Sequence, residues 1–354
     1  MKVEDGIVVS ESVERDFCEA ALQIKISPSD AALIADTLVE SDLRGVYSHG
    51  IQIMPRYIRG LSDGINPRPT ITKIVDAGAL VALDGGGGMG QIVSFEAMNI
   101  AIDRARIHGI GSVTVRNSNH MGALSYYGVM AANQGMIGMC FSNAPAIMAP
   151  WGGITETLGN NPACFSVPAG KSYPIILDMA VSTAARNKVR VAAAKGEKLP
   201  LGWALDKEGQ PTTDPEIALA GLLAPMAQAK GFGLAVVIES LTSILGGGLI
   251  GKDVPRDTLF SVDVFKPVHV SHYFQAIDVS KLMDMDEFRS RVDKLYDQVH
   301  ETEMAADTDA VYMPGEIEFL TKENRKKNGI PISKAVLNTL DRIADEIGIS
   351  KLPR

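Results

Sequence analysis

The sequence predicts an α/β protein whose first part is helical. Residues 1–70 have the spacing of helices, and from about residue 71 short apolar strands alternate with helical segments. At 354 residues the chain is long enough to bury a large core and to form two or three domains.

In the helical region, Ser27 is a predicted helix N-cap. Pro28 follows at the first helical position, and Asp30 can complete a capping box. The helix then runs through "AALIADTLVESDLR" and is expected to end at Gly45. The loop "VYSHG" leads into a second amphipathic stretch, "IQIMPRYIRGL", and "SDGINPRP" is typical of a domain boundary.

The region after residue 71 is predicted to contain five short strands and several helices. The expected strands are 79–83, 110–115, 135–142, 163–170 and 173–180. The expected helices are 92–107, 182–195, 232–245, 285–302 and 333–347, with a further helix beginning near Ala123. The stretch "EKLPLGWALDKEGQPTTDPEIALAG" is rich in turn residues, which indicates a surface excursion that returns to the core near Lys230.

Composition narrows the class of protein. Acidic residues outnumber basic ones, 42 to 34, and the formal net charge is −8. The densest basic cluster, 325–327, resembles a surface turn, so nucleic acid is not an expected partner. The most apolar segment, 233–251, contains Glu239 and several glycines, and it is predicted to be a buried core helix rather than a membrane span.

The N-terminus and the cysteines indicate a cytoplasmic protein. "MKVEDGIVVSESVERD" lacks the apolar core of a secretory signal. Cys18, Cys140 and Cys164 form no C-x-x-C pair and leave one cysteine over, which favours reduced cysteines that act as small apolar residues.

The segment "LDGGGGMGQ" (83–91) contains G-x-G-x-x-G between an expected strand and an expected helix. Such a loop can bind the pyrophosphate of a dinucleotide through its backbone N–H groups. However, no acidic residue follows the next strand, where the chain reads "RNSNH", and repeated βαβ units do not follow. A tight turn that only resembles the motif is therefore the alternative, and on the residues alone it is favoured.

Two histidine-containing loops are candidate catalytic sites. In "YSHGIQIMPRY", His49 can exchange a proton near neutral pH, Ser48 can orient its imidazole and Arg56 can bind a carboxylate. In "RNSNHMGALSYY", His120 lies between a strand and a helix, and the helix N-terminus would favour a neutral imidazole. The alternatives are a helix-capping Ser-His pair for the first loop and an ordinary polar turn for the second.

Several glycine-containing polar loops and one H-x-x-H pair are weaker candidates. The loops "SNAPAIMAPWGG", "LGNNPA", "LDMA", "AKGFG" and "MPGEIE" allow close approach of backbone to a flat ligand, and Lys230 could contact a phosphate. His269 and His272 could hold a metal with Asp178 or another histidine, as in a metal hydrolase. Three residues along a strand would point the two rings to opposite faces, which argues against that metal site. A non-catalytic binding protein is a further alternative.

Taken together, these segments resemble the type-2 malate/L-lactate dehydrogenase family. Its members include ureidoglycolate dehydrogenase, sulfolactate dehydrogenase, 2,3-diketo-L-gulonate reductase and Δ1-piperideine-2-carboxylate reductase. The matching segments occur in family order over nearly the whole chain: "DLRGVYSHG", "NSNHMGA", "APWGG", "LGNNP", "LDMA", "LPLGWALDKEGQPTTDP", "AKGFGLA", "MPGEIE" and "ENRKKNGIPI".

The resemblance implies a non-Rossmann fold and a homodimer. Residues 1–70 together with 300–354 would form a helical domain, and 71–299 a nicotinamide-binding domain with a mostly antiparallel sheet and a helical excursion at about 182–230. In such proteins the segment matching "LDGGGGMGQ" is a turn before a helix, so the resemblance implies that the dinucleotide motif is a false positive.

The resemblance also implies roles for individual residues. His49 would donate the proton to the substrate oxygen with Ser48 supporting it, and His120 would lie at the reacting centre. The implied contacts of NAD or NADP are Ile176, Asp178, Met179, Ala180, Lys230, Pro314, Gly315 and Glu316. The expected reaction is hydride transfer between the nicotinamide and C2 of a small 2-oxo or 2-hydroxy acid, and a cyclic imino acid is the alternative substrate.

The chain departs from the family pattern at two positions that bear on the substrate. Ile53 stands where many relatives carry arginine, so Arg56 is the arginine that remains as the candidate for carboxylate binding. Pro145 in "SNAPA" replaces a small polar residue of the relatives. Both departures concern the identity of the substrate rather than the chemistry.

Overall fold

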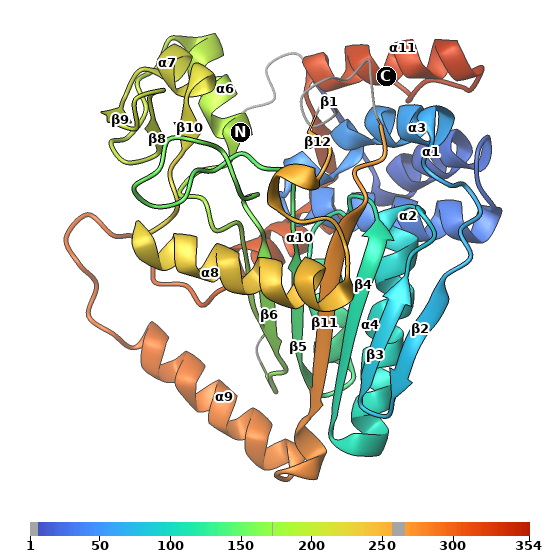
Figure 1. Cartoon of the computed structure of the whole chain (residues 1–354), viewed down its shortest axis with the longest axis vertical. Helices are drawn as coiled ribbons and strands as arrows, with labels where there is room; N and C mark the ends of the chain where they lie inside the picture. The colour runs from blue at the N-terminus through green and yellow to red at the C-terminus, as the bar shows by residue number, and fades with distance from the viewer. Residues whose placement is uncertain (1–5, 172, 257–265) are drawn as a thin grey trace.

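The computed structural model describes residues 6–171, 173–256 and 266–354 (Figure 1). The helices are α1 (Glu11–Gln23), α2 (Pro28–Leu43), α3 (Met54–Asp63), α4 (Gly90–His108), α5 (Ser125–Asn133), α6 (Arg186–Lys195), α7 (Pro215–Ala220), α8 (Ala229–Glu239), α9 (Met285–His300), α10 (Glu316–Asn328) and α11 (Lys334–Ile347). The strands are β1 (Ile7–Val9), β2 (Thr72–Ala77), β3 (Leu80–Asp84), β4 (Ile110–Ser118), β5 (Met136–Ser142), β6 (Ala163–Val167), β7 (Ile175–Met179), β8 (Ala204–Leu205), β9 (Pro211–Thr212), β10 (Leu222–Leu223), β11 (Val270–Asp278) and β12 (Ile330–Ile332).

A seven-stranded sheet forms the centre of the molecule, in the order β2-β3-β4-β11-β5-β6-β7. Its β3–β4 pair is parallel and is connected through α4, whereas the other neighbouring strands are antiparallel. Helices α4 and α5 pack on one face, and α8 with the π-helical turn that follows it lies across the other (Figure 1). The expected mostly antiparallel sheet in a non-Rossmann fold is therefore confirmed.

Both ends of the chain contribute to a separate helical core. Strand β1 pairs with β12, which brings α11 beside the N-terminal helices (Figure 1). Buried apolar side chains of α1, α2, α3, β12 and α11 form one cluster, with Leu38, Tyr57 and Leu340 among its members. A second cluster fills the space between the sheet and helices α4 and α5.

The cap, the proline and the glycine around α2 act as predicted, whereas the predicted capping box does not form. Ser27 caps the helix by accepting the backbone N–H of Asp30, and Pro28 stands at its first position. Asp30 accepts from the Ser27 hydroxyl rather than from its backbone N–H, so the capping box is not complete. Gly45, at φ +82°, ends the helix and turns the chain toward the loop 46–50. This loop begins the candidate site.

Several elements differ from the sequence predictions. Strands β2 and β11 were not predicted, because neither contains a long apolar run. Strand β11 is nevertheless the central strand of the sheet. Both strands form through hydrogen bonds to neighbouring strands of the sheet. Residues 325–327 form the last turn of α10 rather than a surface turn. This helix has only Phe319 buried, so it lacks the apolar stripe that would have identified it, and its basic end is favourable to the helix dipole.

The apolar segment 233–251 is only partly buried. Ile238 packs in the core as predicted, but Val237 is 53% exposed and Leu245 is 63% exposed, so the prediction of a buried helix holds for one face only. Helix α8 also ends at Glu239 and passes into the π turn Ser240–Ile244, where the predicted α-helical pattern continued. Among the described residues, no helix has the length and apolar character needed to cross a bilayer.

Candidate active site

A cavity of about 580 Å³ lies where the helical core meets the end of the sheet. Segments that are distant in sequence line it: the loop after α2, Arg56 of α3, the β4–α5 loop, the β5–β6 connection, strand β7 with the residues after it, the start of β11, and the start of α10. Its walls are mainly apolar, with a small number of polar side chains. This is the usual character of a small-molecule site.

His49 and His120 lie side by side in this cavity. Their ring centroids are 5.4 Å apart and the ring planes are inclined by 18°. His49 belongs to the short 3-10 turn after α2, and His120 lies two residues after Ser118, where β4 ends. The two candidate loops of the sequence therefore form one site.

Each histidine is oriented through its Nδ1 atom. The Ser48 hydroxyl lies 2.9 Å from Nδ1 of His49. Nδ1 of His120 lies 2.8 Å from the Tyr57 hydroxyl and accepts the backbone N–H of Gly122 at 3.4 Å. Because a backbone N–H can only donate, Nδ1 of His120 is unprotonated, and the proton of the neutral ring is on Nε2.

The surroundings favour the neutral form of both imidazoles. Burial in the cavity wall lowers the pKa of His120 well below its usual value, and the positive charges of His49 and Arg56 lower it further. Burial also lowers the pKa of His49, but the carboxylate of Asp178 acts in the opposite direction. Of the two rings, His49 therefore has the neighbour that favours its protonated form.

Three arginines line the cavity, and their environments differ. Arg44 forms an ion pair with Glu40 at 2.6 Å and stacks on Phe319, so its charge is largely compensated. Arg186 donates to the carbonyl oxygen of Leu219. Burial lowers the pKa of Arg56 to about 10, which still leaves it protonated at neutral pH. Arg56 is thus a half-buried cation that lines the same cavity as the two histidines.

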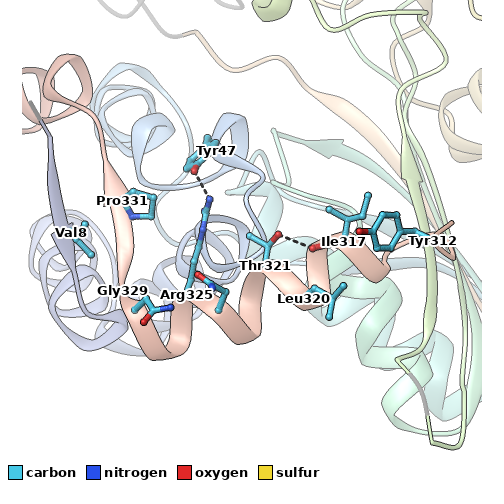
Figure 2. A pocket seen from close by; sticks show the side chains of 11 residues that line it. Val8, Tyr47, Tyr312, Ile317, Leu320, Thr321, Arg325, Gly329 and Pro331 are labelled. Atoms are coloured by element: carbon cyan, nitrogen blue, oxygen red, sulfur yellow. Dashed lines mark hydrogen bonds between the residues drawn. The ribbon is translucent and has the colours of Figure 1, made fainter. Parts of the chain in front are cut away.

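A second hollow, of about 460 Å³, lies on the outer side of α10 (Figure 2). Of the residues that the structure describes, Tyr47, Tyr312, Arg325 and others line it, but no histidine, aspartate or glutamate does. These lining residues provide no group for proton transfer near neutral pH. The cavity that contains His49 and His120 is the candidate active site.

Comparison with known proteins identifies the family to which the chain belongs. The family model described as malate/L-lactate dehydrogenase matches residues 9–341. The chain belongs to this family. The expected family and its fold are therefore confirmed.

Individual members of the family resemble the chain over nearly its whole length. The malate dehydrogenase of Pyrococcus abyssi is 39% identical over 332 residues, which are 91% of this chain and 90% of the relative. The structure of sulfolactate dehydrogenase from Methanocaldococcus jannaschii is 38% identical, with a TM-score of 0.90 over 97% of this chain and 98% of that one. Δ1-Piperideine-2-carboxylate reductase from Pseudomonas syringae pvar. tomato is 26% identical, with a TM-score of 0.84 over 96% and 100% of the two chains.

Most of the site residues predicted from the sequence meet at this cavity of the family fold. Besides the two histidines, these are Arg56, Ile176, Asp178, Met179, Ala180, Pro314 and Gly315. Ser48 contacts His49 without lining the cavity. Lys230 is exposed at the start of α8 and lies outside the cavity lining. Glu316 also lies outside it and binds His300 at 2.9 Å and the backbone N–H of Met313 at 2.8 Å.

Several lining residues were missed at the sequence level. Pro145 was noted as a departure and does line the cavity, whereas Ile53 does not. Arg44, Arg186 and Glu318 line it without having been predicted, and Asn160 comes from the loop "LGNNPA", which was one of the weaker candidates. Arg44 stands next to Gly45 in the matched "DLRGVYSHG" segment, which is the one signal that could have identified it.

The glycine segment 85–88 does not line the cavity. All four of its backbone N–H groups donate to oxygens of the protein itself: Gly85 to Arg116, Gly86 to the Asp84 side chain, Gly87 to Asn117 and Gly88 to Gly85. No donor of this segment is left for a pyrophosphate. The predicted turn is confirmed, and the dinucleotide motif is a false positive.

The H-x-x-H pair is also engaged within the protein. His272 is fully buried, with Nδ1 2.9 Å from the Ser142 hydroxyl and Nε2 2.9 Å from that of Ser118. His269 instead bonds to the side chain of Asn117 at 2.8 Å. Within residues 6–171, 173–256 and 266–354, no group of three or more His, Cys, Asp or Glu side chains is arranged to hold a metal ion.

Proposed function

We propose that this family member transfers hydride between NAD or NADP and C2 of a small 2-oxo or 2-hydroxy acid of the malate or lactate type. The observation that carries the proposal is the stacked pair His49–His120 on the wall of an apolar cavity that also contains Arg56. Two imidazoles and a half-buried cation provide proton transfer and carboxylate binding in one place.

We assign different roles to the two histidines. His120 is neutral with its proton on Nε2, so it donates a hydrogen bond to the substrate oxygen. His49, whose protonation is favoured by Asp178, gives its proton to that oxygen during reduction and takes it back during oxidation. A positioned acid–base group of this kind contributes about 10²–10⁴ in rate.

Arg56 is the proposed partner of the substrate carboxylate. An arginine can bind a carboxylate through two parallel hydrogen bonds, which fixes the orientation as well as the position of the acid. Such a bond would turn C2 of the substrate toward one face of the cavity. Pro145, on the same lining, limits the space for the rest of the substrate.

The cavity wall fits a planar nicotinamide ring. Gly315 has φ +86°, and a Cβ there would come within 2.9 Å of Ile176, so the loop backbone lies directly against β7 with no side chain between them. The cavity volume of about 580 Å³ is also in the range of cofactor sites. When bound, the nicotinamide supplies or accepts the hydride.

The residues that would hold the cofactor in the cavity are those of β7 and of the loop before α10. They are Ile176, Asp178, Met179, Ala180, Pro314 and Gly315. Lys230 and Glu316 stay predictions for a part of the cofactor that extends beyond the cavity. The hydrogen bonds of Glu316 also support a second role, in which it holds the loop 313–315 against β7.

A cyclic imino acid is the second candidate substrate. It is favoured by the likeness to Δ1-piperideine-2-carboxylate reductase over 96% of this chain. An imine carbon accepts hydride as a carbonyl carbon does, and the same histidines would protonate nitrogen instead of oxygen. The paired histidines of the cavity disfavour both a non-catalytic binding protein and a metal hydrolase.

We further propose a cytoplasmic homodimer. The exposed Val237 and Leu245 give the outer face of α8 and its π turn an apolar surface suited to a second copy of the chain. The three buried cysteines are free, in line with a reducing compartment. The domain division, 1–70 with 300–354 against 71–299, belongs to the same proposal and is supported by the shared core of the two chain ends.

Initial rates of NADH and NADPH oxidation test the function. The purified protein would be assayed with pyruvate, oxaloacetate and a cyclic imino acid such as Δ1-piperideine-2-carboxylate. Turnover of a 2-oxo acid is the expected result, and the preferred coenzyme distinguishes NAD from NADP. Turnover of the imine alone would favour the second candidate, and failure to bind either coenzyme would contradict both.

A further inference from the structure

Two carboxyl groups lie against each other beneath the loop that carries His49. Glu14 of α1 is 0% exposed and Asp42 of α2 is 3% exposed. In the described part of the chain, no hydrogen-bond donor lies within reach of either carboxyl oxygen of Glu14. After burial itself, the charge of the Asp42 carboxyl group and hydrogen bonding with it raise the pKa of Glu14, so the two carboxyl groups act on each other directly. A hydrogen bond between two carboxyl groups requires a proton on one of them.

Asp42 holds the backbone just after His49. Its Oδ2 atom accepts the N–H of Ile51 at 2.5 Å. At Gly50, an added Cβ would lie 2.1 Å from the Asp42 carboxyl group, so the loop rests directly on this side chain. The position of His49 therefore depends on the place and charge of the Asp42 carboxyl group.

Tyr47, the residue before Ser48, is held in place by helix α10. Arg325 of α10 donates to the hydroxyl of Tyr47 (Figure 2). It also donates to the carbonyl oxygen of Asp42. Its guanidinium also stacks on the Tyr47 ring, 4.6 Å from the centroid. The segment from Tyr47 to Ile51 is thus fixed at both ends around Ser48 and His49.

The charges around the pair keep one proton on it. Burial raises the pKa of Glu14 well above its usual value and raises that of Asp42 to about 6, while Arg325 lowers both. The other titratable groups that face the pair are Arg15, which lowers the pKa of Glu14, and Cys18, whose own pKa is raised by burial. At neutral pH, Glu14 is the protonated member and Asp42 the ionised one.

We propose that Glu14 and Asp42 share a single proton and act as positioning residues, which hold the loop 47–51 so that His49 faces the substrate. Glu14 donates to Asp42, and the ionised Asp42 then accepts the Ile51 N–H in a charge-assisted bond. The inference rests on the proposed function in so far as it assigns proton transfer to His49. Neither carboxyl group touches the substrate.

Two substitutions of Glu14 separate proton donation from packing. In Glu14→Gln, the amide still donates to Asp42, and we expect turnover within about twofold of the wild type. In Glu14→Leu, Asp42 loses its donor, and we expect kcat to fall on the order of 10–100-fold, as when a catalytic group is displaced. The acid limb of the kcat–pH profile should also move to higher pH, because Asp42 is then protonated more readily. Asp16→Asn, an exposed position on the same helix, is the control.

Two further measurements do not depend on turnover. In the wild type at neutral pH, infrared spectroscopy should detect the C=O stretch of a buried protonated carboxyl group, and Glu14→Gln should abolish it. Amide hydrogen exchange at Ile51 should be faster in Glu14→Leu than in the wild type and in Asp16→Asn. If Glu14→Leu does not fold, Asp42→Asn replaces it, with faster exchange at Ile51 expected from the lost charge.

The outcomes are distinct. Absence of the Glu14-dependent infrared band would overturn the shared proton. Unchanged Ile51 exchange and an unchanged acid limb in a folded Glu14→Leu protein would overturn the positioning role. If the wild type turns over none of the substrates tested, the proposed function fails, while the infrared band and the exchange rates still decide whether the carboxyl pair holds the loop.

Discussion

Two pairs of histidines in the molecule differ in how far apart they are in sequence and in what their ring nitrogens contact. His269 and His272 are three residues apart in sequence and have the spacing of a metal motif. His49 and His120 are separated by two helices and three strands, yet their rings stack at 5.4 Å. The pair that is close in sequence is bonded to the protein, and the pair that is distant in sequence lines a cavity.

The difference lies in where the ring nitrogens are directed. Both nitrogens of His272 are engaged by the buried hydroxyls of Ser118 and Ser142. In His49 and His120, a neighbouring hydroxyl occupies Nδ1, which leaves Nε2 as the nitrogen available to a substrate. A histidine can act on a ligand only when its hydrogen-bonding capacity is not satisfied by the protein.

Replacement of the cavity histidines should have the largest effect. We expect His49→Ala and His120→Ala each to lower kcat/KM by about 10²–10⁴, because each removes a positioned group that transfers or donates a proton. Steady-state assays with the preferred substrate measure this effect. His269→Ala, which removes an imidazole outside the cavity lining, is the matched control and should stay within about twofold. Near-normal turnover in both cavity variants would contradict the assignment.

The buried His272 should make folding stability depend on pH. Burial lowers the pKa of His272 to about 4, below its unfolded value near 6.5. Its contribution is therefore fully present above about pH 6.5 and is lost as the pH falls toward 4, because the unfolded chain then binds the additional proton. We expect a loss of about 3 kcal/mol in the free energy of unfolding over this range. Urea unfolding at several pH values measures it. His272→Leu should lack this component, and equal pH dependence in the two proteins would refute it.

At constant pH, His272→Leu should destabilise the protein more modestly. The Ser118 hydroxyl is fully buried and would lose its bond to the ring, at a cost of about 1–3 kcal/mol in unfolding free energy. Urea unfolding at pH 7.5 gives the value. His269→Ala, at a half-buried position, is expected to cost less. A larger loss in His269→Ala would reverse the proposed ranking of the two residues.

The smallest effect is expected from metal chelation. Since the H-x-x-H pair is bonded to Asn117, Ser118 and Ser142, treatment with EDTA should leave both the turnover and the unfolding midpoint of the protein within error. Loss of activity on chelation, restored by a divalent cation, would show that a metal site has been missed.

Local signals in the sequence were sufficient for some parts of the fold. Ser27, Pro28 and Gly45 define α2 because caps and turn residues act on their immediate neighbours. The strands near 79–83, 110–115 and 135–142 were predicted because each is an apolar run in a mainly buried sheet. Helix α10 was missed because nearly all of its residues are polar, and β11 because its central position depends on strands from earlier in the chain.

The sequence alone determined the family, the limits of α2 and the presence of reactive side chains in the "SHG" and "NHMG" loops. The tertiary structure alone decided that His49 and His120 meet, that the glycine turn donates all its N–H groups to the protein and that Glu14 lies against Asp42. The physical reason is the range of the interactions. Caps and turns depend on residues a few positions apart, whereas the environment of a titratable group depends on burial and on partners that packing brings from distant segments.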